Sequence, residues 1–225
     1  MYNEAAIICS TARTLTDYLQ KNFDNYELLF VDDGSTDGSA RLVRDLKLPD
    51  TFVLGYEKNR GKGCAVRTGM LAATGDISMF LDADLAYGTE VIRQVTDRLE
   101  KSGADVLIGS RTLHPEGYEG YTALRKLASK AYIKVLSIYG GLKLSDSQCG
   151  CKAYRGKAIR DIFSRCETDG FAFDFETILW AQELGYRFVE LPVKIINHRD
   201  SKINVIRDTF RMLRELSAIK KRVRM

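Results

Sequence analysis

Short apolar segments alternate with helical patterns along the chain, and this alternation limits the possible folds more than any other feature. Five segments have the length and apolar character of buried strands: Glu27–Val31, Thr51–Tyr56, Ile77–Leu81, Asp105–Gly109 and Phe188–Val193. Seven segments have helical periodicity, at about 5–21, 39–46, 63–73, 90–102, 121–139, 173–184 and 204–220. The alternation predicts an α/β fold, a mostly parallel sheet flanked by helices, within one domain over residues 1–225.

Composition and cysteine spacing exclude several classes of protein. Hydrophobic residues make up 45% and charged residues 28% of the 225 positions, too much apolar character for a disordered chain. The five cysteines are odd in number and irregularly spaced, and Cys149-Gly-Cys151 does not match the usual spacing of zinc ligands. We therefore expect free thiols in a reducing compartment, and a cytoplasmic protein.

The positive charge is concentrated near the end of the chain. The net charge is +4, but residues 199–225 carry +6 and the preceding residues −2. Apolar residues in this segment recur at helical spacing, which predicts a basic amphipathic helix at about 204–220. It is interpreted either as a docking helix with a solvated basic flank or as a helix on an anionic membrane surface, which would make the protein peripheral. A nucleic-acid partner is not expected, because the basic residues are not interleaved with aromatic ones.

Acidic motifs follow two of the expected strands. Asp32 and Asp33 begin the run Asp-Asp-Gly-Ser-Thr-Asp, and they repel each other unless something binds there. An EF-hand is excluded, because Arg44 stands where that loop requires glutamate. Asp82-Ala-Asp84 follows another strand and suits a divalent cation shared with diphosphate oxygens, although a plain acidic turn has the same pattern.

Basic residues and a further acidic pair stand at similar positions. Asn59-Arg-Gly-Lys-Gly63 fits neither a P-loop nor a dinucleotide fingerprint, but it places Arg60 and Lys62 at a helix N-terminus, which suits a phosphate. Asp174 and Glu176 stand at the head of a helix, where they either serve the site or complement the helix dipole. Further phosphate-binding candidates are Arg111, Arg125, Ser129 and Lys202.

Eight motifs in order over nearly the whole chain resemble those of the family 2 glycosyltransferases with the GT-A fold. Within that family the chain is similar to the polyprenyl-phosphate branch, which includes dolichyl-phosphate glucosyltransferases and mannose synthases. The matching motifs are Tyr2-Asn-Glu4, Val31-Asp-Asp-Gly-Ser-x-Asp37, Asn59-Arg-Gly-Lys-Gly63, Asp82-Ala-Asp84, Gly109-Ser-Arg111, Asp146-Ser-Gln-Cys-Gly150, Phe173-Asp-Phe-Glu176 and Ser201-Lys202.

The resemblance implies a role for each candidate residue. It implies an inverting transfer of a hexose from a nucleotide sugar to a polyprenyl phosphate, assisted by Mg²⁺ or Mn²⁺. Asp82 and Asp84 would meet the metal and the diphosphate, and Asp84, Asp174 and Glu176 are the catalytic candidates. The donor nucleotide would be held by Tyr2, Asn3, Glu4, Asp32, Asp33, Arg60, Lys62 and Asp82, and the acceptor or donor phosphates by Arg111, Arg125, Ser129 and Lys202.

The nature of the acceptor decides which groups the reaction needs. A lipid phosphate is already anionic at neutral pH, so it requires charge neutralisation and in-line placement but no strong base. A sugar hydroxyl acceptor, as in polysaccharide synthesis, would require a base, for which Asp174 or Glu176 is the candidate. A non-catalytic nucleotide-binding protein is the third possibility.

Two departures from the family pattern affect these expectations. Family members carry an apolar strand before Tyr-Asn-Glu, whereas Met1 directly precedes Tyr2 here, so we expect an opened sheet and a trimmed nucleotide pocket. The mannose synthase pattern continues Asp-x-Asp with Leu-Gln, whereas Leu85 is followed by Ala86 here. Together with Asn59-Arg-Gly-Lys-Gly63, this difference favours UDP-glucose as the donor, with GDP-mannose as the alternative.

Overall fold

The computed structural model describes residues 1–197 and 215–223, without the side chains of residues 124, 125 and 128. The strands are β1 (Leu28–Asp33), β2 (Thr51–Tyr56), β3 (Ile77–Phe80), β4 (Val106–Ser110), β5 (Lys152–Arg155) and β6 (Phe188–Pro192). The helices are α1 (Ile8–Asn22), α2 (Ser39–Asp45), α3 (Lys62–Ala72), α4 (Glu90–Ser102), α5 (Ala123–Gly140), α6 (Gly156–Phe163) and α7 (Phe173–Glu183). Residues 215–223 are also helical.

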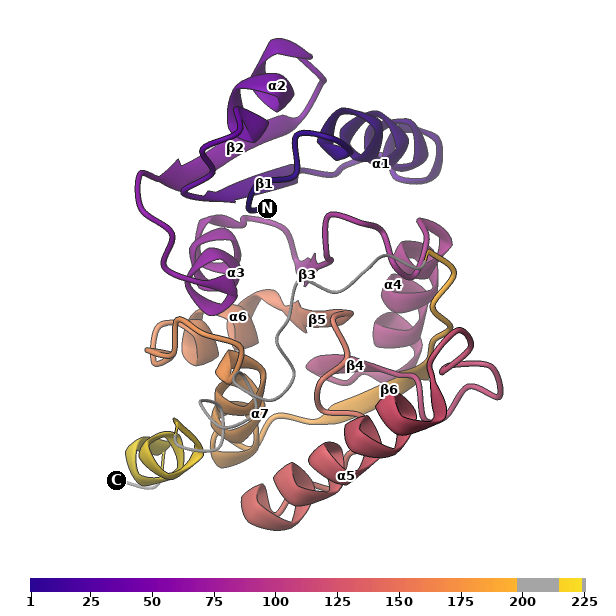
Figure 1. Ribbon diagram of the computed structural model, residues 1–225, viewed down its shortest axis with the longest axis vertical. Helices are drawn as coiled ribbons and strands as arrows, with labels where there is room; N and C mark the ends of the chain where they lie inside the picture. Colours follow the sequence, from indigo (N-terminus) through magenta and orange to yellow (C-terminus); the bar gives the residue numbers. More distant parts are fainter. Residues whose placement is uncertain (198–214, 224–225) are drawn as a thin grey trace.

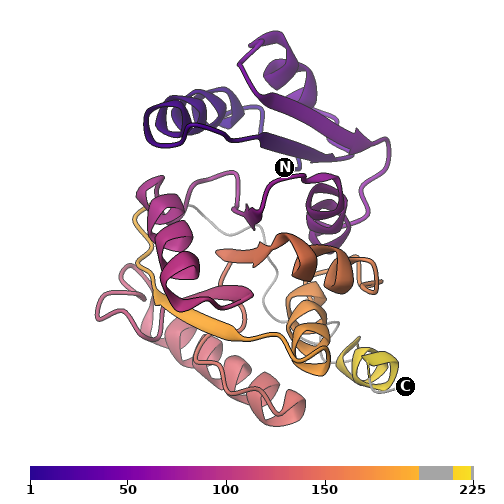
Figure 2. The same ribbon diagram turned by 180° about the vertical axis from the view of Figure 1, so that it is seen from behind.

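The strands form two sheets, and helices flank them (Figures 1 and 2). β1 and β2 are parallel, with Leu28 opposite Thr51. The second sheet has the order β3-β5-β4-β6, in which β4 and β6 are parallel. The expected α/β class and all five expected strands are confirmed.

β5 is the strand that the sequence does not reveal. It pairs antiparallel with both β3 and β4 and so makes the second sheet mixed. Its sequence, Lys-Ala-Tyr-Arg, is short and begins with lysine. Lys152 is nevertheless fully buried, because its ammonium group is paired inside the protein. The sequence alone does not distinguish a buried, paired lysine from an exposed one, so this segment does not show the apolar pattern of a buried strand.

The two sheets are separate at the point where the sequence predicts an opening. Met1 extends the free edge of β1 by one parallel bridge: its amino group donates to the Val31 carbonyl (2.7 Å), and the Asp33 amide donates to the Met1 carbonyl (2.9 Å). β1 has no ladder hydrogen bonds to β3. A large cavity runs between the two strands and reaches the polar motifs at their carboxyl ends. β1 and β3 are thus not paired with each other in the described structure.

Two apolar clusters hold the elements together. One lies between α1, α4 and the strands, and the other contains buried residues of α5, α6 and α7. Leu216, Ile219 and Val223 belong to the second cluster, so residues 215–223 pack against the body of the protein. This agrees with the docking interpretation of the C-terminal helix for its described part; most of the predicted 204–220 helix lies outside the described residues. Within residues 1–197 and 215–223, no helix is both long and apolar enough to cross a bilayer.

Candidate active site

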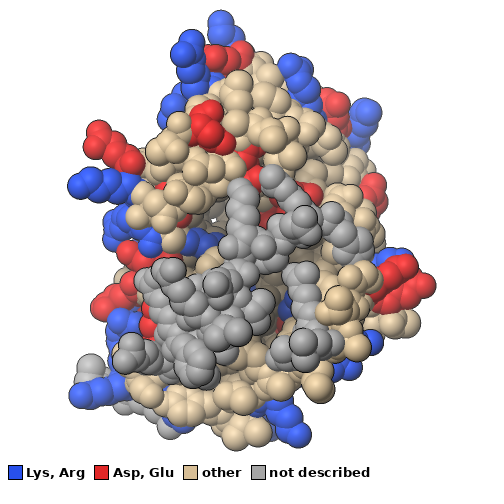
Figure 3. All heavy atoms as spheres, in the orientation of Figure 1, with Lys and Arg blue, Asp and Glu red and all other residues tan. Residues whose placement is uncertain are grey.

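Most of the predicted site residues line one cavity of about 2350 Å³. Acidic atoms are visible near the middle of the face shown in Figure 3. The cavity lining includes Asp33 at the end of β1, residues from the loops after β2, β3 and β4, and residues from the heads of α3 and α7. The predicted site residues in the lining are Tyr2, Glu4, Asp33, Arg60, Lys62, Asp82, Asp84, Arg111, Ser129 and Asp174.

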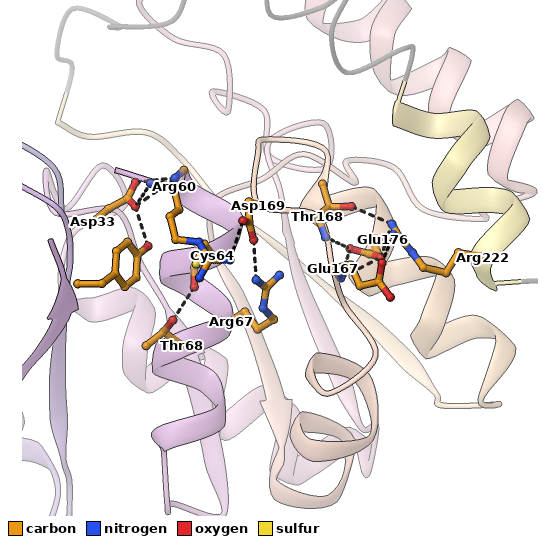
Figure 4. Close-up of polar contacts among 12 residues, drawn as sticks. Asp33, Arg60, Cys64, Arg67, Thr68, Glu167, Thr168, Asp169, Glu176 and Arg222 are labelled. Atoms are coloured by element: carbon orange, nitrogen blue, oxygen red, sulfur yellow. Dashed lines mark hydrogen bonds and ion pairs between the residues drawn. The ribbon is translucent and has the colours of Figure 1, made fainter. Parts of the chain in front are cut away.

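Asp33 fixes the glycine-containing loop that leads into α3 (Figure 4). Its carboxylate accepts hydrogen bonds from the Tyr56 hydroxyl (2.6 Å), from the Asn59 side-chain amide (2.8 Å), and from the backbone amides of Arg60 (2.9 Å) and Gly61 (3.0 Å). Burial, followed by the hydrogen bond to Asp33, raises the pKa of Tyr56, which keeps that phenol protonated. Asp33 therefore shapes the loop that presents Arg60 and Lys62.

Replacing Asp33 by Asn is expected to destabilise the protein by about 2 kcal/mol, because the amide removes a charged acceptor shared by two backbone N–H groups. The change should appear as a lower denaturation midpoint at an unchanged denaturant slope. Asp24 is exposed, so Asp24→Asn serves as the control and should leave the midpoint unchanged. Equal midpoints for both variants would contradict the role assigned to Asp33.

The N-terminal motif docks on the turn after β1. The Ser35 hydroxyl donates to the Asp32 carboxylate (2.5 Å) and accepts from the backbone amide of Asn3 (2.9 Å). Asp32 is buried, whereas Tyr2 is 43% exposed and lines the cavity together with Glu4. Asp32 and Asn3 thus hold the turn in place, and Tyr2 and Glu4 border the cavity directly.

Two ion pairs lie at the cavity, and three of their four side chains (Lys62, Asp82 and Asp174) line it, whereas Lys152 is fully buried behind them. Lys62 Nζ lies 2.5 Å from Asp82 Oδ1, and Lys152 Nζ lies 2.5 Å from Asp174 Oδ1. Burial lowers the pKa of Lys62, but Asp82 and Asp174 outweigh it, so the net pKa is raised. Burial raises the pKa of Asp174, and the neighbouring Lys152 and Lys62 offset this only in part. Each of the two acidic motifs therefore has a lysine ammonium group beside it.

Asp82 and Asp84 fit a divalent cation that is shared with a substrate. Both line the cavity, and Gly150 lies so close that an added Cβ would be 2.6 Å from Asp82 Oδ2. Among the described residues, no cluster of three or more His, Cys, Asp or Glu side chains could hold a metal by itself. Mg²⁺ commonly binds through one or two carboxylates and completes its coordination with phosphate oxygens and water. The pair therefore suits a cation that arrives with a diphosphate.

Arg111 is held by a carboxylate that the sequence places 35 positions away. Its Nε and Nη2 donate to the two oxygens of Asp146 at 2.7 and 2.9 Å, and Asp146 is fully buried. Nη1 lies 3.4 Å from the Tyr121 hydroxyl. Arg111 and Ser129 both line the cavity, as predicted. The side chain of Arg125 and all of Lys202 lie outside the described residues, so their predicted roles stay predictions.

The two acids at the head of α7 have different surroundings. Asp174 lines the cavity, whereas Glu176 does not. Glu176 is fully buried and accepts from the backbone amides of Glu167 (3.1 Å) and Thr168 (2.8 Å). Arg222 lies 2.8 Å from its other oxygen. In the described structure, Glu176 therefore anchors the 167–168 loop and the C-terminal helix to α7 (Figure 4).

Asp169, which the sequence does not single out, connects that loop to the head of α3. Its carboxylate accepts from Arg60 Nη2 (3.0 Å) and Arg67 Nη2 (2.5 Å), and its carbonyl accepts from the Gly63 amide (2.8 Å). The approach is so close that a Cβ on Gly63 would lie 2.3 Å from the Thr168 carbonyl oxygen. The second glycine of the Arg-Gly-Lys-Gly motif is therefore needed for packing.

Replacing Arg222 by Met is expected to lower stability by about 2 kcal/mol, because it leaves the buried Glu176 carboxylate without its cation. Thermal denaturation should show a fall of several degrees. Glu167→Gln removes the other, largely exposed partner of Arg222 and should change stability by less than about 1 kcal/mol. A smaller loss for Arg222→Met than for Glu167→Gln would refute this account.

Similarity to solved structures defines the class of the fold. Glucosyl-3-phosphoglycerate synthase from Mycobacterium tuberculosis superposes with a TM-score of 0.73 at 18% identity, over 97% of this chain and 77% of the other. Mannosyl-3-phosphoglycerate synthase from Rubrobacter xylanophilus gives 0.69 at 17% identity, over 100% of this chain and 73% of the other. The fold is that of the GT-A glycosyltransferases.

Sequence comparison then gives the family. The model of Glycosyl transferase family 2 matches residues 1–163, and the chain belongs to this family. A dolichyl-phosphate beta-glucosyltransferase of Saccharomyces cerevisiae is 30% identical over 241 residues, which cover 97% of this chain and 72% of the relative. Glycosyltransferase AglD of Haloferax volcanii is 28% identical over 94% of this chain, which spans only 34% of AglD. The expected family resemblance is confirmed.

Proposed function

We propose that this protein is an inverting glycosyltransferase that moves a hexose from a nucleotide sugar to a polyprenyl phosphate. UDP-glucose is the favoured donor and GDP-mannose the alternative. Similarity to dolichyl-phosphate beta-glucosyltransferases supports this acceptor class. A structure of the mycobacterial synthase, which has the same fold, contains Mn²⁺, UDP-glucose and glycerol 3-phosphate, which supports the donor class.

The distribution of charge in the cavity is the observation that carries the proposal. Asp82 and Asp84 lie in the loop after β3, and Lys62, Arg60 and Arg111 line the same cavity. No histidine is among the described residues that line it. Such a site binds phosphates at two places and offers few groups suited to removing a proton. This matches a reaction whose nucleophile is already anionic.

Different residues would bind the donor and the acceptor. Asp82 and Asp84 would hold Mg²⁺ or Mn²⁺, which when bound neutralises charge on the departing diphosphate. Lys62 lies beside Asp82 and supplies a further positive charge to that diphosphate. Arg111 Nη1 and Ser129 would hold the acceptor phosphate. One phosphate oxygen bonds to the anomeric carbon as the bond from that carbon to the nucleoside diphosphate breaks on the opposite face, which inverts the configuration.

A sugar hydroxyl acceptor is the second candidate function, and the position of Asp174 favours it. Asp174 lines the cavity, and burial, which Lys152 and Lys62 only partly offset, raises the pKa of this carboxyl, which makes the carboxylate a stronger base. On this hypothesis, Asp174→Asn abolishes transfer but leaves donor binding intact.

A panel of UDP- and GDP-sugars tests the proposal, with Mg²⁺ or Mn²⁺ and either a short polyprenyl phosphate or an oligosaccharide as the acceptor. We expect a β-linked glycosyl phosphoprenol from the lipid acceptor. Transfer only to the oligosaccharide would establish the second candidate. If calorimetry shows nucleotide binding but no acceptor is glycosylated, both proposed transfer reactions are wrong. The protein would then be a non-catalytic nucleotide-binding protein.

A further inference from the structure

Helix α5 has one face that belongs to the protein interior. Ser129 and Tyr132 line the active-site cavity from this face. Ile133 is 6% exposed and Leu136 is fully buried. Leu136 belongs to an apolar cluster of the core, and Ile133 is also buried, so this face packs α5 against the body of the protein.

The opposite face of α5 presents apolar side chains to solvent. Leu127 is 67%, Val135 47% and Ile138 74% exposed, and Ala131 between them is also exposed. Positions 127, 131, 135 and 138 are spaced so that they form one stripe along a helix. Leu127 and Ile138 are the most exposed of the large apolar residues in the described structure. A stripe of this kind marks an interaction surface.

A row of lysines runs beside the apolar stripe. Lys126, Lys130 and Lys134 are four residues apart, and all three are exposed. The whole of α5 contains no aspartate or glutamate. Apolar side chains beside a row of lysines are the pattern of a helix that lies in the surface of an anionic bilayer. A second copy of this chain is a poor occupant, because it would bring two rows of lysines together.

We propose that the exposed face of α5 docks on an anionic lipid bilayer, with Leu127, Val135 and Ile138 entering the acyl boundary and the three lysines contacting lipid headgroups. α5 lies along the outer edge of the molecule in both ribbon views, far from β1 and β2 (Figures 1 and 2). A bilayer at this edge contacts the protein without covering the β1–β2 side of the cavity.

Docking on this surface would bring the acceptor phosphate close to the cavity. Ser129 and Tyr132 stand on the side of α5 opposite the stripe, so a bilayer beside the helix is one helix diameter from the cavity. The docking surface itself rests on exposure and charge and does not depend on the proposed transfer reaction. The two can therefore fail separately.

Flotation with lipid vesicles tests the docking surface directly. The full chain should float with vesicles that contain phosphatidylserine, bind far less to pure phosphatidylcholine, and lose binding as salt is raised. Lys126→Gln/Lys130→Gln/Lys134→Gln should weaken binding roughly 100-fold. Leu127→Gln/Val135→Gln/Ile138→Gln should weaken it by at least about 10-fold.

Matched variants on other surfaces serve as controls. Lys21, Lys101 and Lys157 are exposed lysines on α1, α4 and α6, and their replacement by Gln should leave binding within about 2-fold of the original. Equal losses for the two lysine triples would show non-specific charge attraction and overturn the proposal. Loss of binding only when Arg207, Arg211 and Arg214 are replaced by Gln would assign membrane binding to the basic C-terminal segment instead.

A local probe keeps the test independent of overall affinity. Tryptophan at position 138 (Ile138→Trp) should be quenched by lipids that carry bromine on their acyl chains. Tryptophan at position 52 (Phe52→Trp) should not, because Phe52 is a similarly exposed residue on the distant strand β2. Equal quenching at both positions, or no flotation of the unaltered chain, would overturn the proposal.

Discussion

Replacing Asp82 or Asp84 by Asn is expected to reduce glycosyl transfer by roughly 10³-fold. Both carboxylates line the cavity, and Asp82 also pairs with Lys62. An amide keeps the size of the side chain but removes the charge that a divalent cation requires. Initial rates with Mn²⁺ titrated against a fixed donor concentration would measure the loss, and both the maximal rate and the apparent Mn²⁺ affinity should fall.

The control for these variants makes the same Asp→Asn change at a position away from the cavity. Asp45 is exposed, and among the described residues its ion pair is with Arg41, one turn earlier on α2, so Asp45→Asn should retain full activity. Direct Mn²⁺ binding, followed by electron paramagnetic resonance with UDP present, separates metal binding from catalysis. Unchanged Mn²⁺ affinity in Asp82→Asn and in Asp84→Asn would remove these residues from the metal site.

Arg111→Met is expected to lower stability by about 3 kcal/mol or more and to decrease the melting temperature by roughly 10 °C. The variant leaves Asp146 fully buried with no cation beside it. It also removes a guanidinium group from the lining of the cavity, so acceptor binding should weaken together with stability. Thermal denaturation gives the first effect, and the KM for the polyprenyl phosphate gives the second.

A double variant distinguishes the structural role of Arg111 from its role in binding. Arg111→Met with Asp146→Leu replaces a buried ion pair by apolar groups and should recover most of the lost stability. The acceptor KM should stay high, because the guanidinium group is still missing. Recovery of both properties would show that Arg111 only supports the fold.

Elements with a complete local signal could be predicted from the sequence. α4 begins and ends where expected, because a strong amphipathic pattern is closed by Gly103, whose φ of 61° ends the helix in the left-handed region. β2 also has its predicted bounds. β5 was missed, because its burial depends on Lys152 meeting Asp174, a residue 22 positions later. No local pattern contains that contact.

In the candidate site, too, local motifs could be predicted from the sequence and long-range contacts could not. The motifs after the strands placed Lys62, Asp82 and Arg111 around one cavity, as strand direction requires. The long-range contacts that hold the loops around these groups could not be predicted from spacing. Asp169 meets Arg67 across 102 positions, and Arg222 meets Glu167 across 55. Such contacts become visible only when the chain is folded.

The division between the two sheets affects how the protein opens. No ladder hydrogen bond joins β1 to β3, so separating the β1–β2 pair breaks no backbone bond of the β3-β5-β4-β6 sheet. The pair is attached through side-chain packing instead, by the contacts of α3 with β1 and β2 and by the apolar cluster that it shares with α1 and α4. Amide protons of β1 should exchange with solvent through a smaller opening free energy than those of β4, which is buried along its whole length. A nucleotide that binds beside Asp33 would raise the opening free energy of the β1 amides and so reduce the difference from β4. Local unfolding and donor binding would then be thermodynamically linked.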